Sequence, residues 1–318
     1  MYEKIPKIVI TDCDHPSVEI EKGILKVIPH ELVEADCQKE EDVINIAQDA
    51  VALINQYAPI SNRVIESLKE CKVIVRYGVG VDNIDVEAAK KHGIIVANVP
   101  DYCIDEVSAH AMALALNCAR KITLLDKNIQ HQKWDFSKAK PIFRTLGKTF
   151  GLLGLGKIAR AIARKAIGFG FNIIAYDPYI PEVNLKIKLV PFHQLLKDAD
   201  FISIHAPLTN KTKYLFGEKE FNAMKKNAYL INTARGSIID EKALYKALKE
   251  KWIAGAALDV MENEPPKWDS SLLKLDNLIL TPHISFYSED SYIELKTKVA
   301  EAVIAVLKGK KPLSIINS

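Results

Sequence analysis

A glycine-rich turn near the middle of this 318-residue chain restricts the folds that it can adopt. Gly154, Gly156 and Ala159 form the pattern G-x-G-x-x-A between an apolar run that begins near Thr149 and a helical apolar pattern that begins at Ile158. In such a turn the first glycine allows the chain to turn tightly, the second lets a ligand approach the backbone, and the small third residue lets the helix pack closely on the strand. The pattern therefore predicts a β-α-β unit of a parallel sheet.

The residues around this turn also suit a phosphate and a ribose. The helix that follows Gly156 would offer free N–H groups and a partial positive charge at its N-terminus. The next strand candidate ends in Asp177, about 20 residues past the turn, where a carboxylate can accept a hydrogen bond from a ribose 2′-OH. This combination predicts dinucleotide binding. The alternative is an ordinary glycine-rich turn, with Asp177 as a solvated strand end.

Apolar runs alternate with helical patterns along nearly the whole chain, which is typical of an α/β layer fold with mainly parallel strands. The first part of the chain contains the strand candidates Ile8–Thr11, Ile24–Ile28, Val51–Asn55, Val73–Arg76 and Ile94–Asn98, with helical stretches at Asp42–Ala50 and Ser61–Lys69. Further strand candidates follow at Phe150–Leu153, Asn172–Asp177, Phe201–His205, Ala228–Asn232, Gly255–Asp259 and Leu278–Thr281. This second series predicts a doubly wound sheet.

Length and pattern together predict two domains, the first of them discontinuous. A chain of 318 residues has the length of two average domains. Pro100 interrupts the pattern just before a long apolar helix over Ile104–Arg120. After Ser285 the chain enters one last helix, which cannot form a domain by itself, so we expect it to pack on the first domain. The expected domains are residues 1–99 with 285–318, and residues 100–284.

Composition and charge argue against several classes of protein. The chain is 48% hydrophobic and 26% charged, with a net charge of only +3. It has no basic run with interleaved aromatic residues and no apolar run long enough to span a membrane, so we expect neither nucleic acid nor membrane as a partner. Met1–Pro6 carries no apolar h-region, and the five cysteines are scattered without a C-x-x-C pair. We therefore expect a cytoplasmic protein with reduced thiols and no bound metal.

Three polar residues late in the chain, Arg235, Glu264 and His283, each lie in a short motif. The guanidinium of an arginine can hold a carboxylate at two points, and a histidine can donate or accept a proton near neutral pH. A carboxylate beside the histidine can fix its tautomer and keep it protonated. These are the groups that the reduction of a 2-keto acid requires. Taken singly, they could be a structural histidine, a surface arginine and a loop acid.

The motif residues also fall where a doubly wound sheet binds its ligands, at the carboxyl ends of the strands. Asp177, His205, Asn232, Asp259 and His283 each end or closely follow a strand candidate. We expect His205 to pack near the adenine or the pyrophosphate rather than to take part in chemistry. Asp259 could instead cap a helix or a turn.

Together these motifs resemble the D-isomer-specific 2-hydroxyacid dehydrogenase family over nearly the whole chain. Besides the glycine turn, the resemblance includes Tyr77–Asp85 (YGVGVDNID), His205–Thr209 (HAPLT), Asn232–Gly236 (NTARG), Leu258–Val260 (LDV), Glu264-Pro265 and Thr281–Ile284 (TPHI). Ala159 stands where many members have glycine, and the third position of the turn tolerates alanine. The resemblance implies two Rossmann-like, doubly wound domains, with the NAD-binding domain inserted into a discontinuous substrate domain, a cleft between them, and a homodimer built through the NAD-binding domain.

The resemblance also implies a role for each site residue. Arg235 would bind the substrate carboxylate and keto oxygen, His283 would be the acid/base, and Glu264 would be its partner. The residues expected to contact NAD are Gly154, Gly156, Lys157, Ile158, Asp177, His205, Pro207, Thr233, Arg235 and Asp259. Those expected to contact the substrate are Arg76, Val79, Gly80, Arg235 and His283. The expected reaction is reduction of a 2-keto acid by NADH to the D alcohol, or its reverse.

Two branches of the family fit the runs Val75–Asn83 and Pro100–Cys103 equally well. One contains phosphoglycerate dehydrogenases, and the other contains the C-terminal-binding proteins, which are corepressors that keep the fold and bind NAD(H). The sequence thus leaves an enzyme and an NAD-dependent interaction module open, and it does not identify the hydroxy acid. Arg76 is either a ligand for a second anionic group of the substrate, such as a phosphate, or a charge paired within its own domain.

Overall fold

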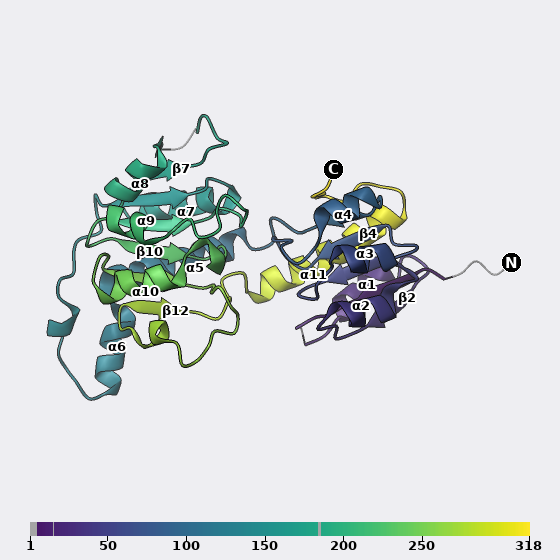
Figure 1. Ribbon diagram of the computed structural model, residues 1–318, viewed down its shortest axis with the longest axis horizontal. Coiled ribbons are helices and arrows are strands. Elements are labelled where there is room, and N and C mark those ends of the chain that lie inside the picture. The colour runs from purple at the N-terminus through teal and green to yellow at the C-terminus, as the bar shows by residue number, and fades with distance from the viewer. Residues whose placement is uncertain (1–4, 15, 184–185) are drawn as a thin grey trace. The chain divides into compact units, whose positions relative to one another are not determined.

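The computed structural model describes residues 5–14, 16–183 and 186–318. The expected absence of a targeting signal in Met1–Pro6 rests partly on residues 1–4, which lie outside the described residues. The fold is of the predicted α/β class, with a five-stranded and a seven-stranded parallel sheet. The chain divides into two compact units, residues 1–103 with 288–318 and residues 104–287 (Figure 1). In the described residues, no helix combines the length and the apolar character that crossing a membrane requires.

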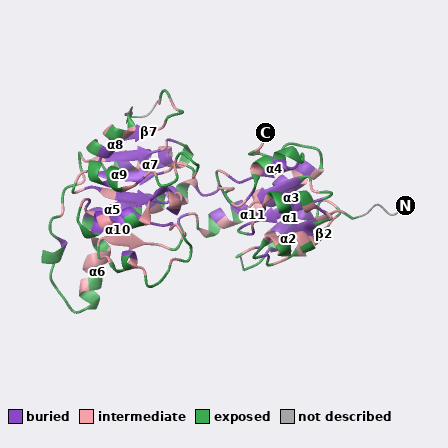
Figure 2. Cartoon of the chain, in the orientation of Figure 1, coloured by how far each residue is buried: buried purple, intermediate pink, exposed green. Residues whose placement is uncertain are grey.

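The first unit has the sheet order β2-β1-β3-β4-β5. Its strands are β1 (Lys7–Ile10), β2 (Glu31–Glu34), β3 (Ala50–Asn55), β4 (Val73–Arg76) and β5 (Ile95–Ala97), and its helices are α1 (Glu19–Leu25), α2 (Glu40–Ala47), α3 (Asn62–Ser67), α4 (Val86–Lys91) and α11 (Glu289–Leu307). The central strands are buried because helices cover the sheet, which explains why they appear in the sequence as continuous apolar runs (Figure 2). One buried cluster joins the sheet to α2, α3 and α4.

The last helix, α11, packs on α1 and β4 of this unit. Ser288 begins it as an N-cap whose hydroxyl accepts a hydrogen bond from the N–H of Ser291. Lys296 of α11 lies 3.7 Å from the buried carboxylate of Glu21 in α1, and that carboxylate accepts a 2.7 Å hydrogen bond from the hydroxyl of Tyr77. These two polar side chains lie in the core beside each other, and the Tyr77 hydroxyl satisfies one oxygen of the carboxylate.

One predicted strand, Ile24–Ile28, is wrong. The first two residues of this run, Ile24 and Leu25, are the end of helix α1. The strand of this region is β2, which the sequence analysis does not predict. A short apolar run does not distinguish a strand from a buried helical segment, and Leu25 is fully buried as part of the helix. Strand β2 lies at the edge of the sheet and has glutamates at both ends, so it lacks the apolar run of a central strand. Charged residues are a common way to protect such an edge.

The second unit has the order β12-β11-β10-β9-β6-β7-β8. Its strands are β6 (Thr149–Leu153), β7 (Asn172–Tyr176), β8 (Ile187–Leu189), β9 (Phe201–Ile204), β10 (Tyr229–Asn232), β11 (Gly255–Leu258) and β12 (Leu278–Leu280). Helices α5 (Ile104–Arg120) and α7 (Lys157–Gly168) contribute to one buried cluster, and α8 (Phe192–Asp198), α9 (Glu218–Ala223) and α10 (Glu241–Lys249) contribute to another. The sheet is thus covered on both faces, as a doubly wound fold requires (Figure 1).

The strand order reverses at β6, which lies between β9 and β7. The chain leaves β6 toward β7 and later returns to the opposite side through β9, so the loops after β6 and β9 diverge. In open parallel sheets this switch point forms the crevice in which ligands bind. It is the glycine-rich turn, Gly154–Gly156, that follows β6.

Helix α6 (Ile122–Gln130) is a further element that the sequence analysis does not predict. It has no buried residue, and Figure 1 shows it projecting from the rest of the second unit together with the segment that follows. Several large apolar side chains of this region are exposed, and Trp134 is 93% exposed. Such a concentration of exposed apolar residues is unusual on a surface that faces only water.

Candidate active site

The glycine turn has the predicted strand–turn–helix form. Gly154 adopts a φ of +85°, and a Cβ there would lie 2.7 Å from the carbonyl oxygen of His205, so both conformation and space require glycine. Gly156 is the N-cap of α7, and a Cβ there would meet no atom within 4 Å. Ala159 is fully buried. The N-terminus of α7 therefore faces open space that a phosphate can occupy.

Asp177 follows β7 and supports this turn directly. Its Oδ2 accepts a 2.8 Å hydrogen bond from the N–H of Leu155, and its Oδ1 accepts a 2.9 Å bond from the N–H of Tyr179. A carboxylate oxygen has a second lone pair, so these bonds leave capacity for a ribose hydroxyl. Asp177 thus has a structural role that the spacing alone did not indicate.

His205 lies at the end of β9, beside the glycine turn. Its Nε2 is 2.7 Å from the hydroxyl of Ser203, and burial lowers the pKa of the imidazole to about 3. The ring is therefore neutral at neutral pH. A neutral ring is consistent with packing rather than with acid–base chemistry at this position.

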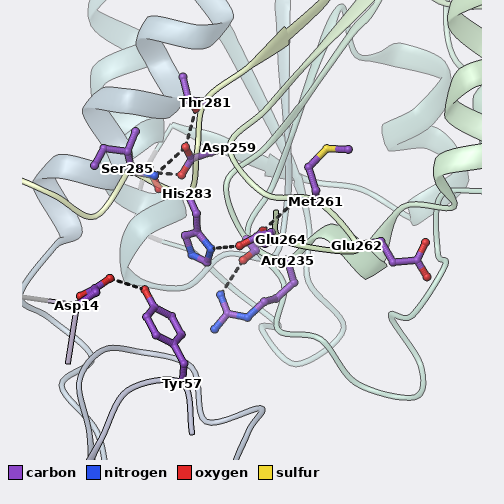
Figure 3. Close-up of polar contacts among 12 residues, drawn as sticks. Asp14, Tyr57, Arg235, Asp259, Met261, Glu262, Glu264, Thr281, His283 and Ser285 are labelled. Carbon is purple, nitrogen blue, oxygen red and sulfur yellow. Dashed lines mark hydrogen bonds and ion pairs between the residues drawn. The ribbon is translucent and has the colours of Figure 1, made fainter. Parts of the chain in front are cut away.

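The imidazole and the carboxylate of the predicted triad meet in the structure. His283 Nδ1 lies 2.6 Å from Glu264 Oε2, while Glu264 Oε1 accepts a 2.8 Å hydrogen bond from the N–H of Met261 (Figure 3). Burial disfavours the charged form of Glu264, but the hydrogen bond and charge of His283, the N–H of Met261 and the charge of Arg235 together outweigh it and lower the pKa of this carboxyl. Glu264 is therefore ionised at neutral pH and can pair with an imidazolium.

Arg235 reaches the same place from the loop after β10. Its Nη1 donates a 2.7 Å hydrogen bond to the carbonyl of Ala234, and Asn232 Nδ2 donates a 2.8 Å bond to the carbonyl of Arg235. A Cβ at Gly236 would lie 1.9 Å from the carbonyl carbon of Met261, so only glycine lets these two loops approach. The Arg-Gly pair in the motif is thus explained by the contact that brings Arg235 beside the loop of Glu264.

The loop that carries His283 is fixed by a buried carboxylate, Asp259, which is 1% exposed. Asp259 Oδ1 accepts hydrogen bonds from the hydroxyl of Thr281 at 2.5 Å and the N–H of Ile284 at 3.0 Å, and Oδ2 accepts one from the N–H of Ser285 at 2.9 Å. These bonds stabilise the backbone of His283, which has a φ of 51° in the left-handed region. A contact between Asp259 and the cofactor stays a prediction.

Thr281 and His110 contribute to this support, and sequence analysis missed both roles. His110 Nε2 of α5 lies 3.0 Å from the Thr281 hydroxyl and 3.7 Å from Asp259 Oδ1. A signal was present for Thr281, since it lies in the Thr281–Ile284 motif, but a histidine within an apolar helix gives no sign of its distant partner.

The predicted substrate residues of the first unit lie at the carboxyl end of β4. Gly78 has a φ of +137°, and a Cβ there would lie 1.6 Å from Arg76 Nη1, so the guanidinium lies against this glycine. Val79 is 37% exposed, and its carbonyl accepts a 2.6 Å hydrogen bond from Asn98 Nδ2. The N–H groups of Val79 and Gly80 have no acceptor among the described residues. Adjacent free N–H groups of this kind can bind an anion.

Comparisons with known proteins agree with this geometry. The model of the "D-isomer specific 2-hydroxyacid dehydrogenase, NAD binding domain" matches residues 112–285. A D-3-phosphoglycerate dehydrogenase of Methanocaldococcus jannaschii is 43% identical over 315 residues, which is 98% of this chain but only 59% of that protein. A glyoxylate reductase of Korarchaeum cryptofilum is 38% identical over 93% of each chain.

Solved structures show the same likeness over the full length. The crystal structure of a D-lactate dehydrogenase from Aquifex aeolicus, complexed with NAD and lactic acid, has a TM-score of 0.89 and 26% identity over 98% of this chain and 99% of that one. The named relatives thus differ in the hydroxy acid while they share the fold. With its glycine turn, its triad and these matches, the chain belongs to the D-isomer specific 2-hydroxyacid dehydrogenase family and contains the family's NAD-binding domain.

Proposed function

We propose that this chain is an NAD-dependent oxidoreductase that interconverts a D-2-hydroxy acid and its 2-keto acid. The observation that carries the proposal is the hydrogen bond between His283 and Glu264, with the charge of Arg235 beside it, at the carboxyl edge of a doubly wound sheet. A proton donor, a partner that stabilises its charged form and a fork for a carboxylate are the groups that this reaction needs.

The residues at this edge fit a dinucleotide. The space before Gly156 is open at the N-terminus of α7, and the buried hydroxyl of Thr233 has no hydrogen-bond partner among the described residues. We propose that the backbone of Gly156, Lys157 and Ile158 binds the pyrophosphate and that Thr233 donates to the cofactor. NAD supplies the hydride acceptor or donor when it is bound. Contacts of His205, Pro207 and Asp259 with it stay predictions.

Each triad residue has one proposed task. Arg235 binds the carboxylate and the keto oxygen of the substrate, which orients C2 for reaction. His283 donates its proton from the ring to the oxygen that becomes the alcohol, and Glu264 stabilises the imidazolium before that transfer. The N–H groups of Val79 and Gly80 are proposed to bind the substrate carboxylate from the first unit.

The proposal is tested by incubating the purified chain with NADH and a panel of 2-keto acids that includes glyoxylate, hydroxypyruvate, pyruvate and 3-phosphohydroxypyruvate. We expect NADH absorbance to fall with at least one of them, and the product to be the D enantiomer. If the protein binds NADH tightly and oxidises it with no member of the panel, the NAD-dependent interaction module is the better interpretation.

The substitution Glu264→Gln is expected to move the alkaline limit of keto-acid reduction to lower pH. Because the pKa of Glu264 is lowered, its carboxylate is charged at neutral pH and can pair with an imidazolium until the pH falls to the range in which Glu264 itself is protonated. Glutamine keeps the shape of the side chain but removes the charge that stabilises an imidazolium, so we expect reduction to decline at a lower pH. The measurement is the pH profile of kcat, and an unmoved alkaline limb would show that Glu264 does not act through His283.

Asp177 is expected to select NADH over NADPH, since a carboxylate accepts from a 2′-OH and repels a 2′-phosphate. The informative change is Asp177→Asn, because the amide oxygen can still accept from the N–H of Leu155 in the glycine turn, and only the bond from Tyr179 is lost. We expect the ratio of kcat/KM for the two cofactors to narrow in this variant. Equal values of kcat/KM for NADPH and NADH in the wild-type protein would contradict the assignment.

Arg76 is the proposed contact for a second anionic group of the substrate. Its guanidinium lies against Gly78. Burial and Asp14 raise the pKa of the Tyr57 phenol to about 12, and the positive charge of Arg76 opposes this rise. We expect Arg76→Ala to raise KM about tenfold or more for 3-phosphohydroxypyruvate and to leave glyoxylate nearly unaffected, because a hydrogen bond to a charged group contributes about 1.5–3 kcal/mol. Steady-state kinetics with both substrates decides, and an equal effect on the two would make Arg76 structural.

A homodimer through the second unit is the proposed assembly. The exposed apolar side chains on and after α6 support it, namely Ile122, Ile129, Trp134, Phe136, Phe143 and Leu146. An apolar surface of this kind is covered in most stable proteins by a partner. The mass in solution is measured by light scattering for the wild type and for the double variant Trp134→Glu, Phe136→Glu. We expect the mass of a dimer for the wild type and that of a monomer for the variant, and a monomeric wild type would contradict the assembly.

A further inference from the structure

The loop that is proposed to bind the substrate carboxylate is held in place by a strand end and by the segment that follows α11. The carbonyl of Gly78 accepts a 2.9 Å hydrogen bond from the N–H of Val99, and the carbonyl of Val79 accepts a 2.6 Å bond from Asn98 Nδ2. Asn98 follows edge strand β5 and is 7% exposed. Both carbonyls are therefore directed toward the same support.

Peptide planarity converts these bonds into an orientation of the N–H groups. In a trans peptide the C=O of one residue and the N–H of the next lie in one plane and point in opposite directions. Because Val99 fixes the carbonyl of Gly78, it also fixes the N–H of Val79. In the same way, Asn98 fixes the N–H of Gly80 through the carbonyl of Val79. These are the two N–H groups that lack an acceptor among the described residues.

The amide of Asn98 is in turn held by Ser314. The Ser314 hydroxyl donates a 2.6 Å hydrogen bond to Asn98 Oδ1, which directs Nδ2 to the carbonyl of Val79. Ser314 belongs to a segment that runs along β5: the N–H of Ile316 donates to the carbonyl of Val96, and the Asn317 amide bonds Val96 and Ile94. The hydroxyl is thus positioned by the bonds that Ile316 and Asn317, just after Ser314, make to β5 and to the residue before it.

We propose that Ser314 is a positioning residue, which orients the Asn98 amide and thereby the Gly80 N–H toward the substrate carboxylate. This inference rests on the proposed function, since it assigns a support to the same carboxylate site. The effect should appear in substrate binding and not in cofactor binding, because the bonds concerned lie in the first unit, at the end of β4 and β5.

The test compares Ser314→Ala with two matched variants. Ser314→Thr keeps the hydroxyl, and Asn317→Ala loosens the same segment without removing a bond to Asn98. We expect Ser314→Ala to raise KM for the best keto acid about 2- to 10-fold, which is the loss of one hydrogen bond of about 0.5–1.5 kcal/mol. The KM for NADH should not change. Ser314→Thr should restore the wild-type KM, and Asn317→Ala should have a smaller effect than Ser314→Ala.

A double-mutant cycle tests whether Ser314 acts on the substrate site through Asn98. If Ser314 acts through Asn98, Ser314→Ala should raise KM in the wild-type background but not in the Asn98→Ala background. An unchanged KM in Ser314→Ala, or equal effects in both backgrounds, would overturn the inference while wild-type turnover still supported the proposed function. If the wild type turned over no keto acid, the proposed function itself would fail. The inference would then be tested by calorimetry of the binding of a keto acid or oxalate to the wild type and the variants. We would expect a weaker affinity for Ser314→Ala.

Discussion

Substitution of His283 by asparagine is expected to lower kcat of keto-acid reduction by about 10²- to 10⁴-fold, the range that is typical for loss of a general acid. The side chain of asparagine cannot supply the proton that the developing alcohol oxygen takes up. Asparagine is preferred to alanine for a structural reason. His283 has a φ of 51°, and asparagine tolerates this left-handed region better than most residues. The loop held by Asp259 should therefore keep its conformation.

The measurement is kcat under saturating keto acid and NADH, together with the NADH dissociation constant from a fluorescence titration. We expect the dissociation constant to stay close to that of the wild type, because the glycine turn and Asp177 are unaltered. A second control is the pH profile of the residual activity, which should lose the alkaline limb that Glu264 controls in the wild type. A kcat close to that of the wild type would remove His283 from the chemistry.

Substitution of Arg235 by lysine is expected to lower kcat/KM by about 10²- to 10⁴-fold. Lysine keeps the positive charge near Glu264 but lacks the planar fork, so it cannot hold a carboxylate and a keto oxygen at two points. Each hydrogen bond between charged groups contributes about 1.5–3 kcal/mol, and the loss of two in the transition state gives a reduction of this size. Retention of charge makes the experiment specific, because Glu264 keeps a cation beside it.

The same variant separates binding from orientation. A rise in KM with unchanged kcat would mean that Arg235 only binds the carboxylate, whereas a fall in both kcat and kcat/KM would mean that it also places C2 for reaction. We expect the second result. Activity equal to that of the wild type would show that a cation at this position suffices and that the fork has no role. The shape of the pH profile should not change in this variant, which distinguishes it from Glu264→Gln.

The strands of the central sheets could be predicted from the sequence because they are buried on both faces. Val73–Arg76 and Ile104–Arg120 were predicted with the bounds that the structure has, as a short apolar run and a long helical pattern. The glycine turn was predictable because each of its small residues meets a local requirement, such as the φ of +85° at Gly154. At the edges the same reasoning failed. Strand β2 has only two apolar residues between its glutamates, which is too short a run to predict a strand. The apolar residues of α6 are not buried, so they do not belong to the core pattern on which the prediction of the other helices depends.

By itself, the sequence determined the fold class, the glycine turn and the three residue types of the triad, since these depend on local spacing and on short motifs. Only the tertiary structure decided how those residues are supported. Asp259 is buried under the His283 loop, Gly236 allows the approach to Met261, and Ser314 bonds to Asn98 across 216 residues of sequence. Such contacts leave no periodic trace, because they form between residues that only the packing of helices on sheets brings together.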